Sequence, residues 1–247
     1  MASYDFRAQR LFVDVPLREA EQVALGREQA HYVLNVLRLD EKSPILAFNG
    51  RDGEWLARLV RSGKRDAALL PERRTRDQTS PGDLHYLFAP LKQARLDYLV
   101  QKAVEMGASA IRPVLTRHTQ VSRVNRERML ANVIEAAEQC GVLSVPDVLE
   151  EVRLDSLLEG WDASRLLVFC DEDAEVADPL EALRAAAPAP ISLIVGPEGG
   201  FSAEERDRLL RLPHVLRLSL GPRILRADTA AVAALALVQA VRGDWKG

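Results

Sequence analysis

Two glycine-proline loops carry the residues of this chain that are best suited to chemistry. The apolar run at residues 191–195 leads into GPEGGFSAEE, and the run at residues 214–220 leads into GPRILRADTAA. Both have the order strand, Gly-Pro loop, helix. Ligands of open α/β sheets bind beyond the carboxyl ends of the strands, so both loops lie where a site is expected. Ser202 and Glu205 predict a capping box for the helix after the first loop.

The charges of the two loops indicate which ligand each one suits. Glu198 lies inside the first loop, where a carboxylate would repel a phosphate, so this loop suits a neutral or cationic ligand better. Neither a dinucleotide-binding nor a P-loop glycine motif occurs. In the second loop, Arg223 and Arg226 bracket two apolar residues. The apolar residues can flank a flat ring, while the two guanidiniums can reach a phosphate or a developing negative charge. These residues favour an adenine-like ligand beside an anionic partner. The alternative is that Gly-Pro only turns the chain and the arginines pair with acids.

The elements that must position these loops alternate between strand and helix from residue 84 onward. Strands are predicted at residues 85–91, 110–115, 165–170 and 191–195, and continuous apolar runs are typical of parallel strands buried on both faces. Apolar spacing predicts a helix from Ala94 to Met106, and Asn125 is the predicted cap of a helix that runs to Gln139. The fold class is therefore α/β with a mostly parallel sheet.

The first 70 or so residues are predicted to be mostly β. Residues 45–60 alternate apolar and polar side chains across a turn at residues 49–53, which predicts a hairpin. Residues 29–37 predict a short helical turn. The segment PERRTRDQTSPGD has almost nothing to bury, which is typical of a linker. We therefore expect a first domain over residues 1–72, a linker over 73–83 and a second domain over 84–247.

The charge balance limits the ways in which this chain can bind nucleic acid. Its 33 Lys and Arg against 36 Asp and Glu give a net charge of −3, which excludes the overall basic surface of a non-specific nucleic-acid binder. RNA or DNA contacts are then expected from local patches, above all from residues 112–128, which hold five arginines and a single glutamate. The alternative for this stretch is a solvated loop.

Cysteine usage and hydropathy exclude several classes of protein. Cys140 and Cys170 are the only cysteines, so neither a disulfide framework nor a cysteine zinc site is available. No His/Asp/Glu cluster has metal-ligand spacing. The first 15 residues lack the apolar run of a secretory signal, and the longest apolar run, residues 230–238, is shorter than the roughly 18–20 residues of a membrane span. We expect a cytoplasmic protein with no metal and no membrane partner.

The motifs together resemble the RsmE-type family, the ribosomal small-subunit rRNA (uridine-N3)-methyltransferases of the SPOUT superfamily. The most specific are the paired loops GPEGGFSAEE and LSLGPRILRADTA. RLFVD near the start, HYVLNVLRL, NGRDGEW, residues 91–119 and EAAEQCG follow in the family's order, so the resemblance covers nearly the whole chain. Three places depart from the usual pattern: Val142 stands where the family usually has Arg, Asp228 stands where Glu is commoner, and residues 40–44 (DEKSP) replace a more usual Gly-Asp turn.

The resemblance implies a particular fold and cofactor. Residues 1–72 would form a PUA-like β-barrel that helps to hold RNA, and residues 84–247 a SPOUT domain with a C-terminal trefoil knot. Family members are homodimers that bind S-adenosyl-L-methionine in the knot, with a third wall here at residues 169–171. The apolar helix at residues 229–241 suits a knot core or a dimer interface equally. The implied cofactor-binding residues are Gly196, Pro197, Glu198, Gly199, Gly200, Leu218, Leu220, Gly221, Ile224, Leu225 and Arg226.

The implied reaction is methylation of N3 of a specific uridine in 16S rRNA, in the assembled small subunit. Because the uridine N3–H is weakly acidic, methyl transfer needs in-line positioning and either a base or a cation that stabilises charge. Arg223 and Arg226 are the candidates for phosphate positioning and charge stabilisation. Glu198 is the candidate to position the ligand or relay a proton, and its alternative role is to accept loop amides. The expected RNA contacts are Arg10, Arg38, Arg117, Arg123 and Arg126.

Three other functions remain open at this point. The first is a SPOUT methyltransferase with another RNA target, a ribose 2′-O or a different base, which product analysis would separate. The second is a non-catalytic RNA-binding assembly factor, which would bind RNA without cofactor affinity. The third is a metabolic enzyme for an adenine-containing ligand, which salt-insensitive binding would favour.

Overall fold

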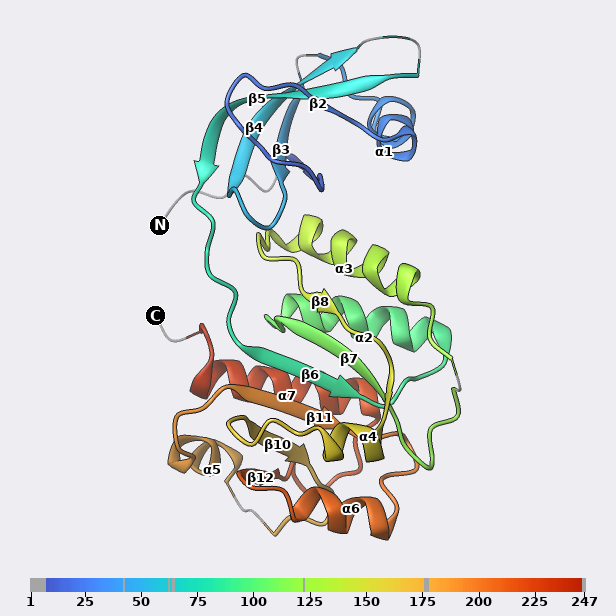
Figure 1. Cartoon of the computed structure of the whole chain (residues 1–247), viewed down its shortest axis with the longest axis vertical. Coiled ribbons are helices and arrows are strands. Elements are labelled where there is room, and N and C mark those ends of the chain that lie inside the picture. The colour runs from blue at the N-terminus through green and yellow to red at the C-terminus, as the bar shows by residue number, and fades with distance from the viewer. Residues whose placement is uncertain are drawn as a thin grey trace. The chain divides into compact units, whose positions relative to one another are not determined.

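The structure, a computed structural model, describes residues 8–41, 43–61, 63, 65–121, 123–175 and 178–245. These residues form two compact units, coloured along the chain in Figure 1. The first unit contains the described residues up to Ser80 together with Ala137–Val145, and the second contains Pro81–Ala136 and the chain from Pro146 onward. Residues 1–7, part of the stretch that predicts a cytoplasmic protein, and residue 122 of the arginine-rich stretch lie outside the described residues.

The first unit is built on a five-stranded sheet with the strand order β1-β3-β4-β5-β2. Its strands are β1 (Gln9–Phe12), β2 (Val23–Ala24), β3 (Pro44–Phe48), β4 (Glu54–Arg61) and β5 (Ala67–Arg76). β1 pairs in parallel with β3, and the other pairs are antiparallel. A helix, α1 (Arg27–His31), continues into the π-helical turn η1 (Tyr32–Val36). The predicted hairpin and the predicted helical turn are confirmed.

β5 continues beyond residue 72, the expected end of the first domain. The composition predicts a linker over residues 73–83, but residues 73–76 complete β5 and pair with β4. Arg76 explains the difference, because its Nε donates to Glu54 Oε1 on β4 at 3.0 Å and its Nη2 donates to Oε2 at 2.6 Å. A strand end held by charged side chains has little apolar surface, so its composition resembles that of a linker.

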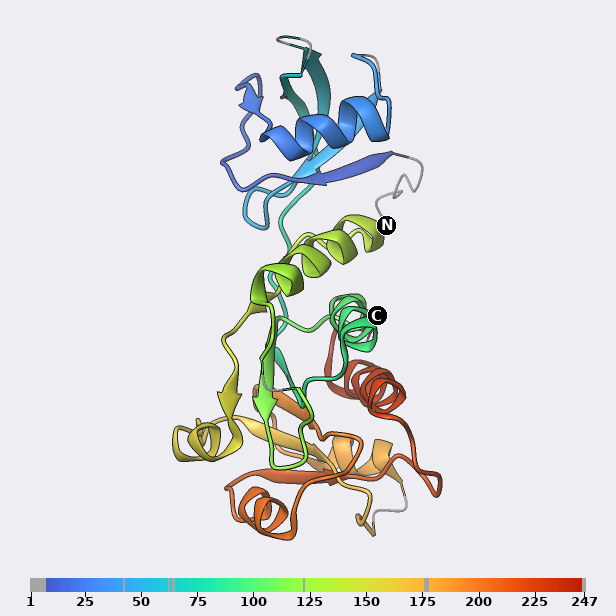
Figure 2. The same cartoon turned by 90° about the vertical axis from the view of Figure 1, so that its right-hand side faces the viewer.

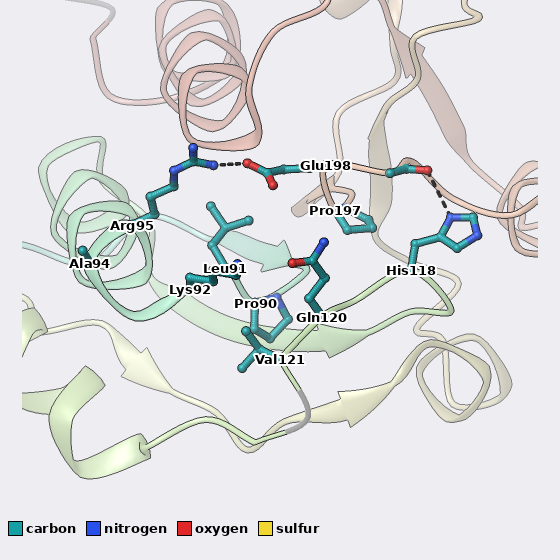
Figure 3. A pocket seen from close by; sticks show the side chains of 11 residues that line it. Pro90, Leu91, Lys92, Ala94, Arg95, His118, Gln120, Val121, Pro197 and Glu198 are labelled. Carbon is teal, nitrogen blue, oxygen red and sulfur yellow. Dashed lines mark hydrogen bonds and ion pairs between the residues drawn. The ribbon is translucent and has the colours of Figure 1, made fainter.

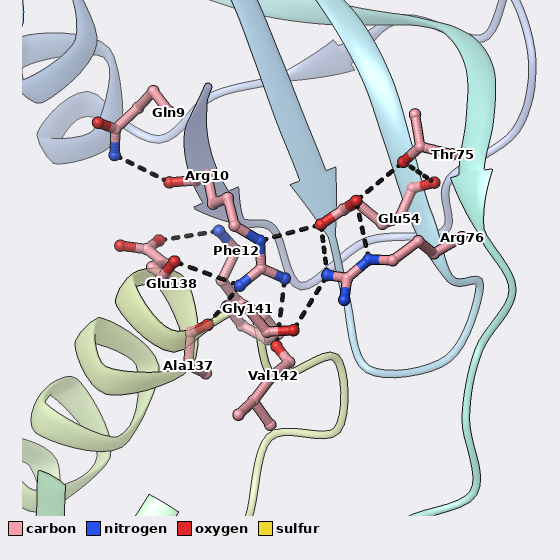
Figure 4. Close-up of polar contacts among 10 residues, drawn as sticks. All are labelled: Gln9, Arg10, Phe12, Glu54, Thr75, Arg76, Ala137, Glu138, Gly141 and Val142. Atoms are coloured by element: carbon pink, nitrogen blue, oxygen red, sulfur yellow. Dashed lines mark hydrogen bonds and ion pairs between the residues drawn. The ribbon is translucent and has the colours of Figure 1, made fainter. Parts of the chain in front are cut away.

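A buried charged cluster, Arg10–Glu54–Arg76, lies in this unit (Figure 4). Arg10 and Glu54 are each 2% exposed, and Arg10 Nε donates to Glu54 Oε2 at 2.9 Å. Both arginines also donate to backbone carbonyl oxygens within residues 137–142, at the end of helix α3. The last carbonyls of a helix have no partner inside the helix. The arginines of the sheet satisfy them, which explains why Ala137–Val145 belongs to the first unit although the sequence places it in the second domain.

The sheet of the second unit confirms the predicted α/β fold class. Its strand order is β12-β10-β11-β6-β7-β8, with β9 paired to β7, and the pairs formed by the described residues are all parallel. Its strands are β6 (Leu84–Phe88), β7 (Ala110–Leu115), β8 (Asp147–Val148), β9 (Val152–Arg153), β10 (Leu166–Cys170), β11 (Ile191–Val195) and β12 (Val215–Leu218). The strands predicted at residues 110–115 and 191–195 have the predicted bounds.

Helices cover both faces of this sheet. The helices after β6 are α2 (Gln93–Glu105), α3 (Arg126–Cys140), α4 (Leu154–Glu159), α5 (Pro179–Ala185), α6 (Ala203–Leu210) and α7 (Ala227–Arg242). Figure 2 shows α2, α5 and α7 on one face of the sheet and α4 and α6 on the other, and α7 contacts α2, α5 and β11. Asn125 Oδ1 accepts the Arg128 N–H at 3.0 Å, and Ser202 and Glu205 form the capping box of α6, so both predicted caps are confirmed.

α7 is the apolar helix that the sequence predicts at residues 229–241. Its buried polar residue, Gln239, is 3% exposed, and its Nε2 donates to the Met106 carbonyl at the end of α2 at 2.7 Å. Gln239 Oε1 accepts the Asp244 N–H at 3.0 Å, so the buried amide is satisfied on both sides. The trefoil knot stays a prediction. None of the described helices has both the length and the apolar character needed to cross a membrane.

Candidate functional site

A first cavity of about 270 Å³ opens at the carboxyl ends of three neighbouring strands, β10, β11 and β12. Its walls are the loops that follow these strands and the first turns of α6 and α7. This is the edge at which open α/β sheets bind ligands. The expected third wall, residues 169–171, lines this cavity. So do nine of the residues expected to bind a cofactor, namely Gly196, Pro197, Glu198, Gly200, Leu218, Leu220, Gly221, Ile224 and Leu225.

Two of the expected cofactor-binding residues do not line the first cavity. Gly199 lines a second cavity instead, and Arg226 is the exposed N-cap residue of α7. Arg223 does line the first cavity. The structure therefore brings Arg223 to the cavity but not Arg226, although the sequence places both in one loop.

Carboxylates outnumber guanidiniums among the described residues that line the first cavity. The carboxylates are Asp171, Glu172, Asp173 and Glu198, and the guanidiniums are Arg206 and Arg223. Asp171 is 5% exposed and accepts hydrogen bonds from Arg206 Nη2 at 2.9 Å and from Arg217 Nε at 2.7 Å. Burial by itself would raise the pKa of Asp171, but the two arginines outweigh it, so the pKa lies below its ordinary value. Asp171 is thus an ionised carboxylate held between Arg206 and Arg217 at the cavity wall.

The rest of the first cavity is tightly packed and partly aromatic. The rings of Phe169 and Phe201 meet edge to face, with centroids 5.3 Å apart. A Cβ at Gly196 would lie 2.6 Å from the Phe201 ring, so only glycine lets the loop pass this ring without a shift. Burial raises the pKa of the Cys170 thiol to about 12, so this lining residue is a neutral thiol and no nucleophile.

A second cavity of about 330 Å³ lies beside the first, and Pro197 and Glu198 line both (Figure 3). Its other walls come from the chain after β6, the start of α2 and the chain after β7. Lys92, Arg95 and His118 contribute nitrogen-bearing side chains to it. Lys92 and Arg95 lie in residues 91–119, one of the segments that carry the family resemblance, but that segment does not indicate that either side chain lines a cavity. The strand-end rule could have found them, because residues 89–95 follow the buried β6 as the Gly-Pro loop follows β11.

Arg95 connects the two Gly-Pro loops. Its Nη1 forms an ion pair with Glu198 of the first loop, and its Nε lies 3.9 Å from Asp228 Oδ2, just after the second loop. Near the other end of the first loop, His118 Nδ1 lies 3.0 Å from the Gly199 carbonyl oxygen and 3.1 Å from that of Gly200. Both of these atoms are acceptors, so Nδ1 carries the proton. The first loop is thus held from two sides.

The structure corrects the expectation that Arg10 contacts RNA. The side chain is 2% exposed, and its N–H groups bond Glu54 and the end of α3. A guanidinium that is buried and occupied in this way cannot reach a phosphate, so Arg10 is a structural residue.

The other four arginines expected to contact RNA are exposed. Arg38 has a left-handed backbone, with φ of 54°. The Arg117 side chain is 68% exposed and lies 3.6 Å from Glu204. Arg126 Nε donates to the Val148 carbonyl at 2.8 Å, while Arg123 lies in the loop before α3. Among the residues that the structure describes, no group of three or more His, Cys, Asp or Glu is arranged to hold a metal ion.

Two family models match this chain. The family model described as RNA methyltransferase domain matches residues 78–239, and the model described as RNA methyltransferase PUA domain matches residues 25–72. The chain is 32% identical to ribosomal RNA small subunit methyltransferase E of Rickettsia conorii, over 93% of this chain and 94% of that protein. It is 28% identical to the Bacillus subtilis protein of the same description, over 96% and 99%.

A solved structure is similar over the same extent. The crystal structure of a ribosomal RNA small subunit methyltransferase E from Neisseria gonorrhoeae, bound to S-adenosyl methionine, superposes with a TM-score of 0.83. That protein is 29% identical to this chain, and the match covers 97% of this chain and all of the other. The likeness therefore includes both units, not the α/β unit alone.

Proposed function

Because this chain belongs to the RsmE-type family of ribosomal small-subunit RNA methyltransferases, we propose that it methylates N3 of a specific uridine in 16S rRNA. The methyl donor is S-adenosyl-L-methionine. One observation carries the proposal: both Gly-Pro loops line a single cavity at the carboxyl ends of β10, β11 and β12. The proposed acceptor atom is N3 of the uridine, rather than a ribose oxygen or an atom of another base.

The residues of the first cavity fit this methyl donor. S-adenosyl-L-methionine supplies a methyl group on a cationic sulfonium, and the excess of carboxylates around the cavity suits a cation. Apolar side chains from the second loop, Leu220, Ile224 and Leu225, suit the flat adenine ring. The glycines of the first loop allow the backbone to come close to the ligand. Gly199 and Arg226 belong to the same two loops and complete the proposed binding segments.

The side chains around the cavity supply the acid–base chemistry. Glu198 lies on the wall shared by both cavities and accepts the proton of uridine N3. The N3–C bond forms as the C–S bond breaks, which leaves a neutral thioether and the proton on Glu198. Arg223 stabilises the negative charge that develops on the uracil carbonyls, and Arg226 positions a phosphate. Neither role requires a metal.

The partners follow from exposed side chains. Phosphates of the rRNA are contacted by four exposed arginines, namely Arg38, Arg117, Arg123 and Arg126. A net charge of −3 gives the chain little general attraction to RNA, so its specificity comes from the shape of the assembled small subunit. A homodimer is supported by apolar side chains that lack full cover: Ile224 is 93% exposed, and Val232 and Leu237 of α7 are half-buried. The cytoplasm is the compartment in which we expect it to act.

Cofactor binding is the first test of the proposal. Calorimetric titration with S-adenosyl-L-methionine should show saturable binding by the wild type. Gly196→Ala should weaken it about 10-fold or more, because the new Cβ pushes the Phe201 ring that lines the cavity. Gly82→Ala is the matched control, since a Cβ at Gly82 meets nothing within 4 Å. No binding by the wild type, with or without small subunits, would contradict the proposal.

Product analysis tests the target atom. Small subunits that lack the modification should yield 3-methyluridine after incubation with the protein and S-adenosyl-L-methionine, as read by nucleoside mass spectrometry. A 2′-O-methyl nucleoside or another methylated base would replace the N3 assignment. Binding of subunits with no methylated product would favour the non-catalytic assembly factor.

A further inference from the structure

The second cavity has no role in the proposed binding of the methyl donor, yet it shares a wall with the donor's cavity. We propose that the second cavity receives the target uridine, with Lys92 holding its phosphate and the Arg95–Glu198 pair contacting the edge of its base. This inference rests on the proposed function and assigns the acceptor side of the same site. Three properties of the cavity support this assignment: its charge, its shape and its position.

The charge of the second cavity differs from that of the first. The described residues around it include Lys92 and Arg95, which are permanent cations at neutral pH, and a single carboxylate, Glu198. The first cavity has four carboxylates against two guanidiniums. A cationic sulfonium is therefore attracted to the first cavity and a nucleotide phosphate to the second. Counted over the residues that line each cavity, the balance of carboxylates and cations therefore differs in the direction that donor and acceptor require.

The shape of the second cavity suits a flat base. Pro90, Leu91, Val121 and Pro197 give it apolar walls, and Figure 3 shows the Gln120 amide pointing between Leu91 and Pro197. An apolar surface with a few convergent polar groups is the usual character of a small-ligand site, and the volume of about 330 Å³ falls in the range of such sites.

The polar groups match the pairing edge of uracil. That edge presents a carbonyl oxygen, the N3–H and a second carbonyl oxygen, so it needs an acceptor flanked by donors. Glu198 is an acceptor, and Arg95 beside it is a donor. The Gln120 amide offers a second donor. Cytosine has a lone pair at N3 and an amino group at C4, both of which these groups would oppose, so the arrangement favours uridine over cytidine.

The position of the cavity brings the acceptor atom to the donor. Methyl transfer requires the nucleophile and the methyl group to be adjacent and in line. Pro197 and Glu198 are the partition between the cavities, and Glu198 is the residue that we propose takes the N3 proton. A base whose N3–H bonds Glu198 therefore lies at the boundary with the first cavity.

The experiment separates acceptor binding from donor binding in the full-length protein. Lys92→Ala and Arg95→Ala are compared with Lys102→Ala, which removes one charge from the same helix but pairs with Glu105 and lines neither cavity. Calorimetry gives the Kd for S-adenosyl-L-methionine, filter binding gives the Kd for unmodified small subunits, and single-turnover methylation gives the rate. Thermal melting reports folding, and Arg95→Lys is the second variant, because it keeps the positive charge but not the forked guanidinium.

We expect Lys92→Ala to bind S-adenosyl-L-methionine within about twofold of the wild type. Arg95→Ala also releases Glu198 of the first loop, so it should lose some cofactor affinity, but far less than it loses in single-turnover rate. The single-turnover rate of both variants at subsaturating small subunits should fall about 10- to 100-fold, as for the loss of a good base or phosphate contact. Lys102→Ala should stay within about threefold, and Arg95→Lys should recover part of the loss.

Each other outcome has a distinct meaning. Wild-type rates and subunit affinities in both variants would overturn the assignment of the second cavity while the methyltransferase stands. An equal loss of cofactor affinity would also overturn it, because both residues would then serve the first cavity. A wild-type protein that neither binds the donor nor methylates subunits would instead remove the proposed function itself.

Discussion

Two clusters of the same residue types differ in burial between the two units. In the first unit, the Arg10 and Glu54 side chains are 2% and 3% exposed, and Arg76 closes the cluster. In the second unit, the Arg95 and Glu198 side chains are 37% and 47% exposed and lie at the wall of a cavity. Both clusters join an arginine to a glutamate that is remote in the sequence.

The difference indicates which arginines can meet a ligand. In the first cluster, carbonyl oxygens at the end of α3 accept from the arginines and Thr75 donates to Glu54, so the buried Arg10 and Glu54 side chains are bonded within the protein. A buried pair of this kind is costly to break, because the remaining charge has no solvent. An exposed pair contributes little stability and can exchange its partner for a ligand. Burial, and not residue type, therefore separates the structural arginines from the binding ones.

The largest expected effect comes from Arg10→Ala. This change leaves the Glu54 carboxylate buried with one of its arginines removed and frees carbonyl oxygens near Ala137. Removal of one partner of a buried ion pair costs about 3–5 kcal/mol. Urea denaturation should show a loss of that size in the free energy of unfolding of the first unit.

A surface pair on the same sheet is the control for Arg10→Ala. Arg58 pairs with Glu72, and the two side chains are 53% and 46% exposed. Arg58→Ala should cost less than about 1 kcal/mol in the same measurement. Equal losses in the two variants would contradict the distinction between buried and exposed clusters.

Local pattern is enough to predict most strands and the longer helices of the α/β unit, although not β8, β9, α4 or α5. The continuous apolar runs at residues 110–115 and 191–195 are strands buried in a parallel sheet, and Ser202 caps α6 as its spacing to Glu205 predicts. An apolar run or a capping pair lies within one strand or one helical turn, so these elements can be predicted without knowing which distant residues they contact. The two Gly-Pro loops were found for the same reason, because each follows its strand directly.

Pairing between distant residues could not be predicted from local pattern. Arg10 meets the end of α3 127 residues away, and Arg95 meets Glu198 103 residues away. An arginine in the sequence does not indicate which acid will reach it, so the sequence predicts an RNA contact at Arg10 and no site role for Arg95. Composition likewise missed that β5 extends to Arg76, because that strand end is held by charge and not by apolar burial.

The next effect in size concerns acid stability. Burial would raise the pKa of Glu54, but Arg76, Thr75 and Arg10 together hold it below its ordinary value of 4.5. Below pH 4.5 the unfolded chain therefore binds more protons at this position than the folded one, and stability falls as the pH decreases through the folded pKa. Urea titrations between pH 5 and pH 3 should give a shallower loss for Glu54→Gln than for the wild type. Equal slopes would mean that protonation of Glu54 does not contribute to the loss of stability in acid.

The smallest expected change in stability comes from Arg95→Ala. The pair with Glu198 is exposed to solvent, and the distance to Asp228 is 3.9 Å, so the free energy of unfolding of the second unit should fall by less than about 1 kcal/mol. Urea denaturation checks this value on the same variant that tests the second cavity. A loss near that of Arg10→Ala would show that Arg95 anchors the two loops as a structural residue. A small loss, together with weakened subunit binding, would place it among the residues that face a ligand, because its exposed pair contributes little to folding and leaves the guanidinium available to a substrate.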